Sequence, residues 1–416
     1  MPQKCRFPFR GIVLYMCNTI PICIMYIYTV YTHISISHVH VCACTLHTQG
    51  EGSQGQLGQG STQWRLLPVR VQGPLAERKV IQVSCGTSHT AALAEKGQLF
   101  TWGSGDNGQL GHGEIEGTDS SVPMLVRSLA QARVTSVSCG AFFTGACCDD
   151  GALWMWGNGA FGQLGTGSKG SSVMPVRVDT LHRQCWVTSV SCGTWHAAAL
   201  GQEARVPGNS LWVWGDNAHG QLGTGCRRSI LQPERLAFGQ QRCGTATVVR
   251  VGCFATHTAC VACEGASLLQ DGRVFTWGNN SSGQLGLGHT CSSLEPTEVA
   301  GFRAMLLSSG PGASHTLAAN RKGLLFAWGS CGFGQLGSGQ RDNLLVPTPV
   351  LGLYENAKEE GEKFAEGSTN VRPHWWRSAA VEDLEKIVHL RMARSRPASE
   401  TQEADSDKVQ GARVGS

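Results

Sequence analysis

Four histidines of this 416-residue chain occupy the same position in successive copies of a sequence repeat, which is described below. Neutral imidazole is a common metal ligand and a common general base. In one further copy of the repeat, the same position is occupied by Phe143. Copies of one position in a radial repeat lie on a ring rather than in one pocket, so we interpret these histidines as structural. They are His89, His196, His257 and His315.

The chain also has 18 cysteines, five of them within residues 1–49. Cys260-Val-Ala-Cys263 lies on a predicted strand, where alternate residues face opposite ways, and no second pair follows at the spacing of a zinc site. Four other cysteines share one repeat position, which favours small buried residues in a reduced cytoplasmic or nuclear compartment. These four are Cys85, Cys139, Cys192 and Cys253.

No other pattern indicates a catalytic centre. The sequence has neither a phosphate-binding loop nor a nucleophile elbow. Asp106 and Asp216 lie near similar turns, but the corresponding segments elsewhere begin with Asn158, Asn279 and Ser330. Paired carboxylates are therefore not indicated. The sequence predicts no catalytic residue, no cofactor-binding residue and no metal ligand, and we expect a binding scaffold rather than an enzyme.

The elements that position these residues are set by an internal repeat. Residues 101–111 (Thr-Trp-Gly-Ser-Gly-Asp-Asn-Gly-Gln-Leu-Gly) recur with little change at 155–165, 213–223, 276–286 and 327–337. A sixth copy at 50–58 has Gln49 where the others have tryptophan. The copies are 51 to 63 residues apart, a period that indicates a repeat architecture.

Each copy contains about four short predicted strands cut by glycine-rich turns, the pattern of a propeller blade. We expect the glycines to adopt positive φ or to allow close backbone approach. We expect Leu110 and its equivalents to fill the gap between blades, and Trp102 and its equivalents to supply large buried surfaces. With 41% hydrophobic residues, the chain has ample material for such a core.

These units resemble the repeats of the regulator of chromosome condensation family over residues 50–353. The resemblance implies an all-β fold, a β-propeller with five complete four-stranded blades and an incomplete sixth. The three strands that the sixth unit lacks could come from the residues just before Gly50. Closing the ring in this way would remove the exposed sheet edges.

The same resemblance implies a non-catalytic protein-interaction propeller. The founding member is a guanine-nucleotide exchange factor for a small GTPase and binds chromatin, so a small GTPase is one implied partner. A net charge of +4 gives no support to chromatin binding. The alternative is a substrate- or cargo-binding scaffold in a ubiquitin-ligase or trafficking complex. Light sensing, another activity in the family, is not expected, because Gly193-Thr-Trp-His196 has no repeated counterpart.

Residues 1–49 do not follow the repeat. Residues 12–31 are apolar enough for a membrane span, although they include Asn18 and Pro21. The alternating Ile/Tyr, Thr/His and Val/His pairs that follow are typical of translated dinucleotide runs. We hypothesise that this segment is read-through from an intron or upstream sequence. The alternative is a signal anchor, and a membrane is an expected partner only in that case.

Three lengthened loops are the expected places for specific contacts, although neutral length variation would explain them equally well. They comprise residues 201–210, 238–247 and 262–270. Residues 354–416 form a polar tail, expected to be largely disordered apart from a helix at 379–393.

Overall fold

The computed structural model describes residues 30–32, 35–42, 45–113, 119–206, 208–237, 246–264 and 270–350. These residues form six antiparallel sheets of four strands each, all within the compact unit Met1–Trp376. The strands of every sheet follow one another in chain order. The prediction of an all-β propeller built from these repeats is confirmed.

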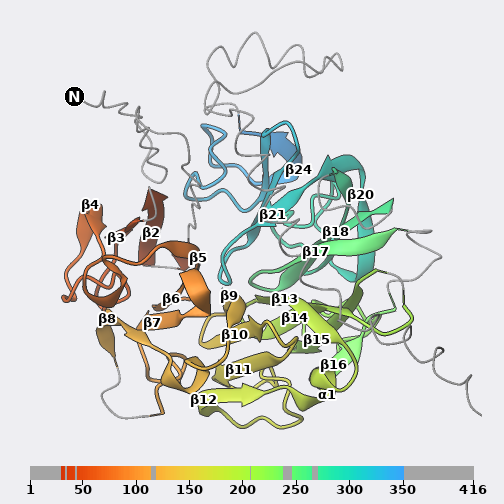
Figure 1. Ribbon diagram of the computed structural model, residues 1–416. Coiled ribbons are helices and arrows are strands. Elements are labelled where there is room, and N and C mark those ends of the chain that lie inside the picture. The colour runs from red at the N-terminus through yellow and green to blue at the C-terminus, as the bar shows by residue number, and fades with distance from the viewer. Residues whose placement is uncertain are drawn as a thin grey trace, which may run out of the picture. The chain divides into compact units, whose positions relative to one another are not determined.

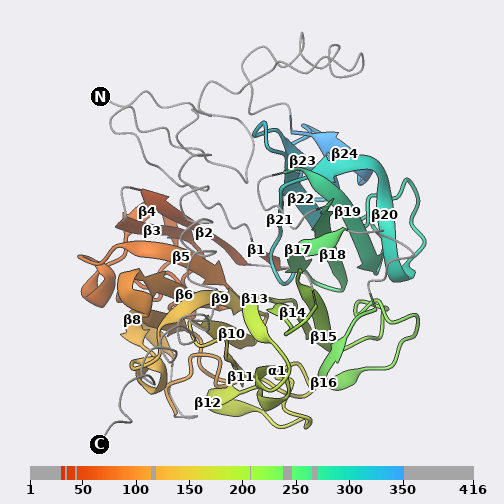
Figure 2. The ribbon, with the colours of Figure 1, turned by 45° about the vertical axis from the view of Figure 1, so that its right-hand side comes forward.

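We call the sheets blades 1 to 6 (Figures 1 and 2). Blade 1 comprises β1 (Val30–Thr32), β2 (Ser35–Cys42), β3 (Thr45–Gly50) and β4 (Arg65–Arg70). Blade 2 comprises β5 (Val80–Cys85), β6 (His89–Ala94), β7 (Leu99–Gly103) and β8 (Ser120–Leu125). Blade 3 comprises β9 (Val134–Cys139), β10 (Phe143–Cys148), β11 (Leu153–Gly157) and β12 (Ser172–Arg177).

The second half of the chain continues in the same way. Blade 4 comprises β13 (Trp186–Cys192), β14 (His196–Gln202), β15 (Ser210–Gly215) and β16 (Ile230–Arg235). Blade 5 comprises β17 (Thr247–Cys253), β18 (His257–Cys263), β19 (Gly272–Gly278) and β20 (Ser293–Ala304). Blade 6 comprises β21 (Leu306–Ser308), β22 (His315–Ala319), β23 (Leu325–Gly329) and β24 (Leu344–Pro349), and one short helix, α1 (Asp179–His182), precedes blade 4.

The sequence repeat and the blade are out of phase by one strand. Each of the first five sequence copies begins with the turn and the fourth (outer) strand of one blade and ends with the inner three strands of the next. The copy that begins at Gly50 therefore supplies β4 to blade 1, and the copy that begins at Ser330 supplies β24 to blade 6.

Three strands end at or before Gly50, where the sequence allowed for the three strands that the sixth unit lacks. Strands β1 to β3 pair with β4 as the inner part of blade 1, so the described propeller strands begin at Val30. The reason is visible in β3, where Thr48 Oγ1 donates a hydrogen bond to the carbonyl of Leu57 at 2.6 Å. Thr101 Oγ1 makes the equivalent bond to Leu110 in blade 2 at 2.7 Å. The intron origin of this segment stays a hypothesis.

Two further predictions concern residues outside the described part of the chain. They are most of the apolar segment at 12–31 and the helix at 379–393. Among the described residues, no helix is long and apolar enough to cross a membrane.

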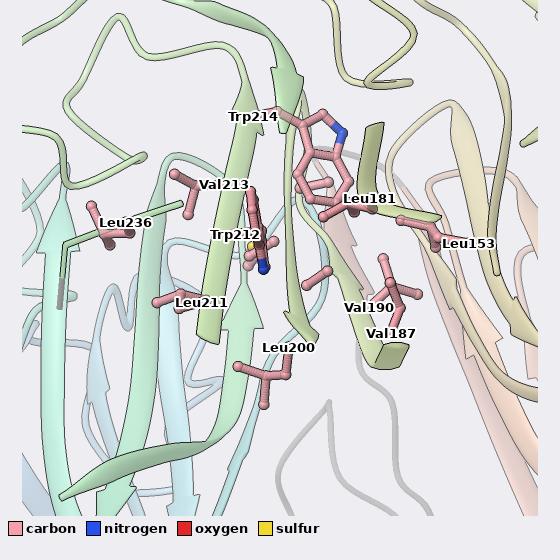
Figure 3. Packing of buried hydrophobic residues seen from close by; sticks show 14 of the residues in the cluster. Leu153, Leu181, Val187, Val190, Leu200, Leu211, Trp212, Val213, Trp214 and Leu236 are labelled. Atoms are coloured by element: carbon pink, nitrogen blue, oxygen red, sulfur yellow. The ribbon is translucent and has the colours of Figure 1, made fainter. Parts of the chain in front are cut away.

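Small residues on the second strand of each blade let neighbouring blades pack closely. Every residue of β6, β10 and β18 is buried, because these strands lie between two sheets. The largest buried cluster runs from blade 3 to blade 5. Within it, Trp212 and Trp214 point to one side of β15, and Leu211 and Val213 point to the other (Figure 3).

The turn before each outer strand docks against the next blade. Gly111, the last glycine of the turn in blade 2, has φ +76°, and a Cβ built on it would lie 2.7 Å from Nε1 of Trp156 in blade 3. The last glycine of the turn in blades 1, 3, 4 and 5 lies in the same way against a tryptophan of the following blade. The expected roles of the glycines are thus confirmed, and the leucine between them is buried in all six turns.

The substitution Gly111→Ala should destabilise the protein more than Gly113→Ala. Both residues have positive φ, which costs an alanine about 1–2 kcal/mol. Only Gly111→Ala also displaces the Trp156 indole and its hydrogen bond, a further loss of about 1–3 kcal/mol. A Cβ at Gly113 would meet nothing closer than the flexible Met174 side chain at 3.4 Å. Urea unfolding of the two variants measures the difference, and equal losses would contradict this role of the turn.

Candidate functional site

In the described part of the chain, the polar side chains of the repeat bind neighbouring blades to each other. We call each contact between two neighbouring blades a junction. At five consecutive junctions, a tryptophan Nε1–H donates to the backbone carbonyl of the turn glutamine in the preceding blade, at 2.8–3.0 Å. The side chain of that glutamine holds its own turn, because its Oε1 accepts a backbone N–H two residues earlier. The five pairs are Trp102–Gln56, Trp156–Gln109, Trp214–Gln163, Trp277–Gln221 and Trp328–Gln284.

Three of the histidines add a hydrogen bond to their junctions, each from the histidine of one blade to a threonine of the next. His89 Nε2 lies 2.9 Å from Oγ1 of Thr144 in the next blade. Thr144 Oγ1 in turn donates to the carbonyl of Gln109 at 2.9 Å. The hydroxyl has one hydrogen, so it accepts from His89, and the hydrogen-bond network assigns the imidazole proton to Nε2. The same arrangement links His196 to Thr258 at 2.9 Å and His257 to Thr316 at 2.8 Å.

Burial keeps these imidazoles neutral. It lowers the pKa of His89, His196 and His257 to about 3 and that of His315 to about 4. All four side chains are 0–1% exposed. A general base has to reach its substrate, and none of these four rings is accessible to one. The structural interpretation of the histidines agrees with both observations.

One junction replaces the hydrogen bond by an apolar pair. Phe143 occupies the histidine position of blade 3, and Ala197 occupies the threonine position of blade 4. Both are fully buried in the same cluster. The two substitutions match each other, because a histidine here would leave Nε2–H without a hydroxyl acceptor.

The repeated Ser-Cys pairs supply a second bond between neighbouring blades. Ser84 Oγ accepts the backbone N–H of Cys139 in the next blade at 2.8 Å. The Ser138–Cys192 and Ser191–Cys253 pairs repeat this bond at 3.0 and 2.8 Å. Burial raises the pKa of the Cys85 and Cys253 thiols to about 12, which agrees with their reading as small buried residues. The role of these serines was not predicted from the sequence, although a serine precedes three of the four cysteines.

The thiols of Cys260 and Cys263 do not share a site. Cys260 packs in the cluster that runs back to blades 3 and 4, whereas Cys263 packs with Val274 and Trp328 on the blade 6 side. In the described ranges, no group of three or more His, Cys, Asp or Glu side chains is arranged to hold a metal ion.

At two surfaces the residues differ from those at the equivalent positions of the other repeats. The first is an aromatic cluster that spans blades 3 and 4. The rings of Phe142 and Trp195 stack with centroids 5.3 Å apart, and Phe161 lies 5.0 Å from Trp195. Phe161 is 40% exposed. We call these three residues the aromatic cluster.

The sequence analysis did not find this cluster, although comparing equivalent positions would have revealed it. The position of Phe142 and Trp195 carries Ser88, Thr256 and Ser314 in blades 2, 5 and 6. The position of Phe161 carries Asn107, His219 and Ser282 in blades 2, 4 and 5. Polar residues therefore suffice for folding at both positions.

The second surface comprises the described residues of the three lengthened loops in blades 4 and 5. These residues flank the second or the fourth strand of a blade, at the strand ends opposite the turns. Asn209 Nδ2 donates to the carbonyl of Val248 at 3.2 Å, which joins the first loop to the start of β17. Arg235 pairs with Glu203 at 2.8 Å. Residues 207, 238–245 and 265–269 lie outside the described part, and specific contact through these loops stays a prediction.

Comparison with known proteins places the chain among propellers of one kind. The family model of the RCC1-like domain matches residues 32–374. The human E3 ubiquitin-protein ligase HERC2 is 32% identical over 276 residues, which are 66% of this chain and 5% of HERC2. The ultraviolet-B receptor UVR8 of Arabidopsis thaliana is 31% identical over 309 residues, which are 74% of this chain and 66% of the receptor.

Among solved structures, human WBSCR16 is 25% identical and superimposes with a TM-score of 0.64. The match covers 78% of this chain and 79% of that protein.

A double substitution should reproduce the apolar junction elsewhere in the ring. His196→Phe alone and Thr258→Ala alone should each destabilise the protein by about 1–3 kcal/mol. His196→Phe removes the bond to the Thr258 hydroxyl, and Thr258→Ala leaves His196 Nε2–H unpaired and removes a donor from the Gln221 carbonyl. The double variant copies the Phe143–Ala197 pair and should recover at least about 1 kcal/mol of the summed loss. Urea unfolding of the four proteins gives this coupling energy. Strictly additive losses would show that the two side chains do not act together.

The buried histidines also predict how stability depends on pH. Their pKa is about 3 in the folded protein and near 6.5 when unfolded, so the unfolded chain binds more protons at mildly acidic pH. Stability should be full above about pH 6.5 and fall towards pH 4, by up to about 1.4 kcal/mol per pH unit for each histidine. The His196→Phe/Thr258→Ala variant should lose one histidine's share of this slope. An unchanged slope would contradict the burial of neutral His196.

Proposed function

Because the chain belongs to the family of RCC1-like domains, we propose that it is a non-catalytic protein-interaction propeller that regulates a small GTPase. The aromatic cluster is the observation that carries the interaction role. Phe161 is exposed, whereas Phe142 and Trp195 are half-buried. Aromatic side chains that meet at one place on a surface are typical of the residues that dominate protein–protein binding energy. Folding does not require them, since other blades have serine, threonine or asparagine at these positions.

The rigidity of the ring suits this role. The junction bonds hold the loops of neighbouring blades in fixed positions, so Phe142, Phe161 and Trp195 are preorganised before a partner arrives. Preorganised contacts reduce the entropy that binding would otherwise cost. Nucleotide exchange needs no covalent chemistry from the propeller, which is consistent with the buried neutral histidines and the buried cysteines of the repeat. The small GTPase as partner rests on the family resemblance.

A second candidate is substrate or cargo recruitment for a ubiquitin ligase. The human relatives HERC2 and HERC6, the latter named as a probable ligase, are 32% and 35% identical to this chain. The chain covers 5% and 25% of their lengths, so ligase activity is not carried over from them. In this role the propeller would bind a protein without releasing nucleotide. Placement in the cytoplasm or nucleus remains part of either proposal.

Nucleotide release from a panel of small GTPases tests the first candidate. The propeller should accelerate the loss of fluorescent GDP from one GTPase. Phe161→Asn and Trp195→Thr should weaken that effect by about tenfold or more, since truncating a central aromatic costs at least about 1.4 kcal/mol. Both substitutions copy residues that other blades carry, Asn107 and Thr256, so the fold should be retained.

Arg205→Glu, at the opposite end of blade 4, is the matched control and should leave release unchanged if the aromatic cluster is the binding site. Partner capture that depends on the cluster, without any nucleotide release, would favour the ligase-type role instead. Full activity of the Phe161→Asn and Trp195→Thr variants would overturn the assignment of the cluster.

A further inference from the structure

The junction of blades 3 and 4 contains a carboxylate next to the aromatic cluster. Asp216 is the first residue of the turn of blade 4. Blade 1 also has an acid at this position, Glu51, but that side chain is buried. A negative charge is not needed for the turn to form, because the other blades have neutral residues there. They are Ser104, Asn158, Asn279 and Ser330 in blades 2, 3, 5 and 6.

Hydrogen bonds hold Asp216 beside the aromatic cluster. Its backbone N–H donates to the carbonyl of Trp195 at 2.8 Å. Its carboxylate accepts the N–H of Ala218 at 3.2 Å and the Nε2–H of Gln221 at 2.8 Å, so the charged group is fixed in place. Asp216 is half-buried. A partner seated on Trp195 would therefore also meet this carboxylate.

The junction of blades 2 and 3 shows how the repeat can fill this place with a neutral pair. There Asn158 Nδ2 donates to Oδ1 of Asn107 in the preceding turn at 3.0 Å. The equivalent residues at the junction of blades 3 and 4 are Asp216 and Phe161. A phenyl ring has no N–H or O–H to donate to a carboxylate, so this bond between turns is replaced by a charge and an aromatic ring.

The charge of Asp216 is not neutralised within the described part of the chain, where no ion pair includes it. Arg227 lies in the same loop between β15 and β16, but its Nη1 donates to the carbonyl of Ala218 at 2.8 Å. A carboxylate that a bound partner withdraws further from water is costly unless that partner brings a cation. The site therefore favours a partner with a positive charge.

We propose that the aromatic cluster and Asp216 together bind an arginine side chain of a protein partner. A guanidinium is planar, stacks on aromatic rings and donates to carboxylates from its edge, so one side chain satisfies both groups. Phe161, 40% exposed, offers the most accessible ring of the cluster. Lysine fits less well, because its ammonium is a compact charge that does not stack. The inference rests on the proposed function in one respect, that the aromatic cluster is the binding site.

NMR titration of the full chain with short blocked peptides tests the proposal without a known partner. The probes are acetyl-Gly-X-Gly-amides with arginine, lysine, glutamine or leucine at X. The indole signals of protein labelled with nitrogen-15 tryptophan report binding, and Trp195→Thr identifies the signal of Trp195. The arginine peptide should shift this signal with a Kd of about 1–10 mM. The glutamine and leucine peptides should bind about fivefold more weakly or worse, because they carry no charge.

The substitution Asp216→Asn isolates the charge. It should preserve the turn, because Asn158 makes the same two bonds in blade 3. Its Oδ1 accepts the N–H of Ala160 at 3.0 Å and the Nε2–H of Gln163 at 3.1 Å. The arginine peptide should bind this variant about fivefold more weakly than the wild type. Asp150→Asn is the matched control and should leave binding unchanged, because Asp150 also accepts the N–H two residues later but lies at the opposite end of blade 3.

Three results would overturn the proposal. They are equal binding of the leucine and arginine peptides, unchanged binding to the Asp216→Asn variant, and no peptide-dependent shift of the Trp195 signal. The test is separate from nucleotide release. Arginine binding at Trp195 without release from any GTPase would support this site and contradict the exchange role. Accelerated release that Asp216→Asn leaves unchanged would contradict this site and leave the exchange role in place.

Discussion

One backbone carbonyl in each of five turns holds neighbouring blades together. At Gln109, this carbonyl accepts the indole N–H of Trp156 and the hydroxyl of Thr144, both from the next blade. A carbonyl oxygen has two lone pairs, so the two donors fill its capacity. The turn must bring its backbone close to the indole, and only glycine fits there at positive φ. The recurring Gly-Gln-Leu-Gly sequence follows from this single requirement.

The same requirement places the remaining polar residues of the repeat. His89 donates to Thr144, whose hydroxyl has already given its hydrogen to the carbonyl, and Ser84 accepts the N–H of Cys139 on the inner strand. Once these groups are buried and paired, their chemistry is directed at the neighbouring blade rather than at a substrate. Positions outside the junctions are free to vary, and Phe161 and Trp195 show where this chain has used that freedom.

Most of the fold could be predicted from the sequence, because the repeat exposes the turn glycines, the tryptophans and the histidines at fixed spacing. Strands before Gly50 could be expected only from the incomplete sixth unit, and their bounds could not be predicted, since Gln49 replaces the tryptophan that marks the third strand elsewhere and Thr48 alone gives little signal. The aromatic cluster was also missed. Phe142 and Phe161 are 19 positions apart and belong to one blade, whereas Trp195 belongs to the next, so only the packing of blade 4 on blade 3 brings the three together. The structural role of the histidines could be inferred from their equivalence, but their threonine partners, about one repeat further on, could not.

The protonation state of the junction histidines tests this account most directly. Two-bond proton–nitrogen correlation spectra of protein labelled with nitrogen-15 histidine report which ring nitrogen carries the proton, and single His→Phe variants assign the signals. The account predicts neutral rings with the proton on Nε2 for His89, His196 and His257, unchanged from about pH 8 to about pH 5. Rings that titrate within this range, or that carry the proton on Nδ1, would contradict it.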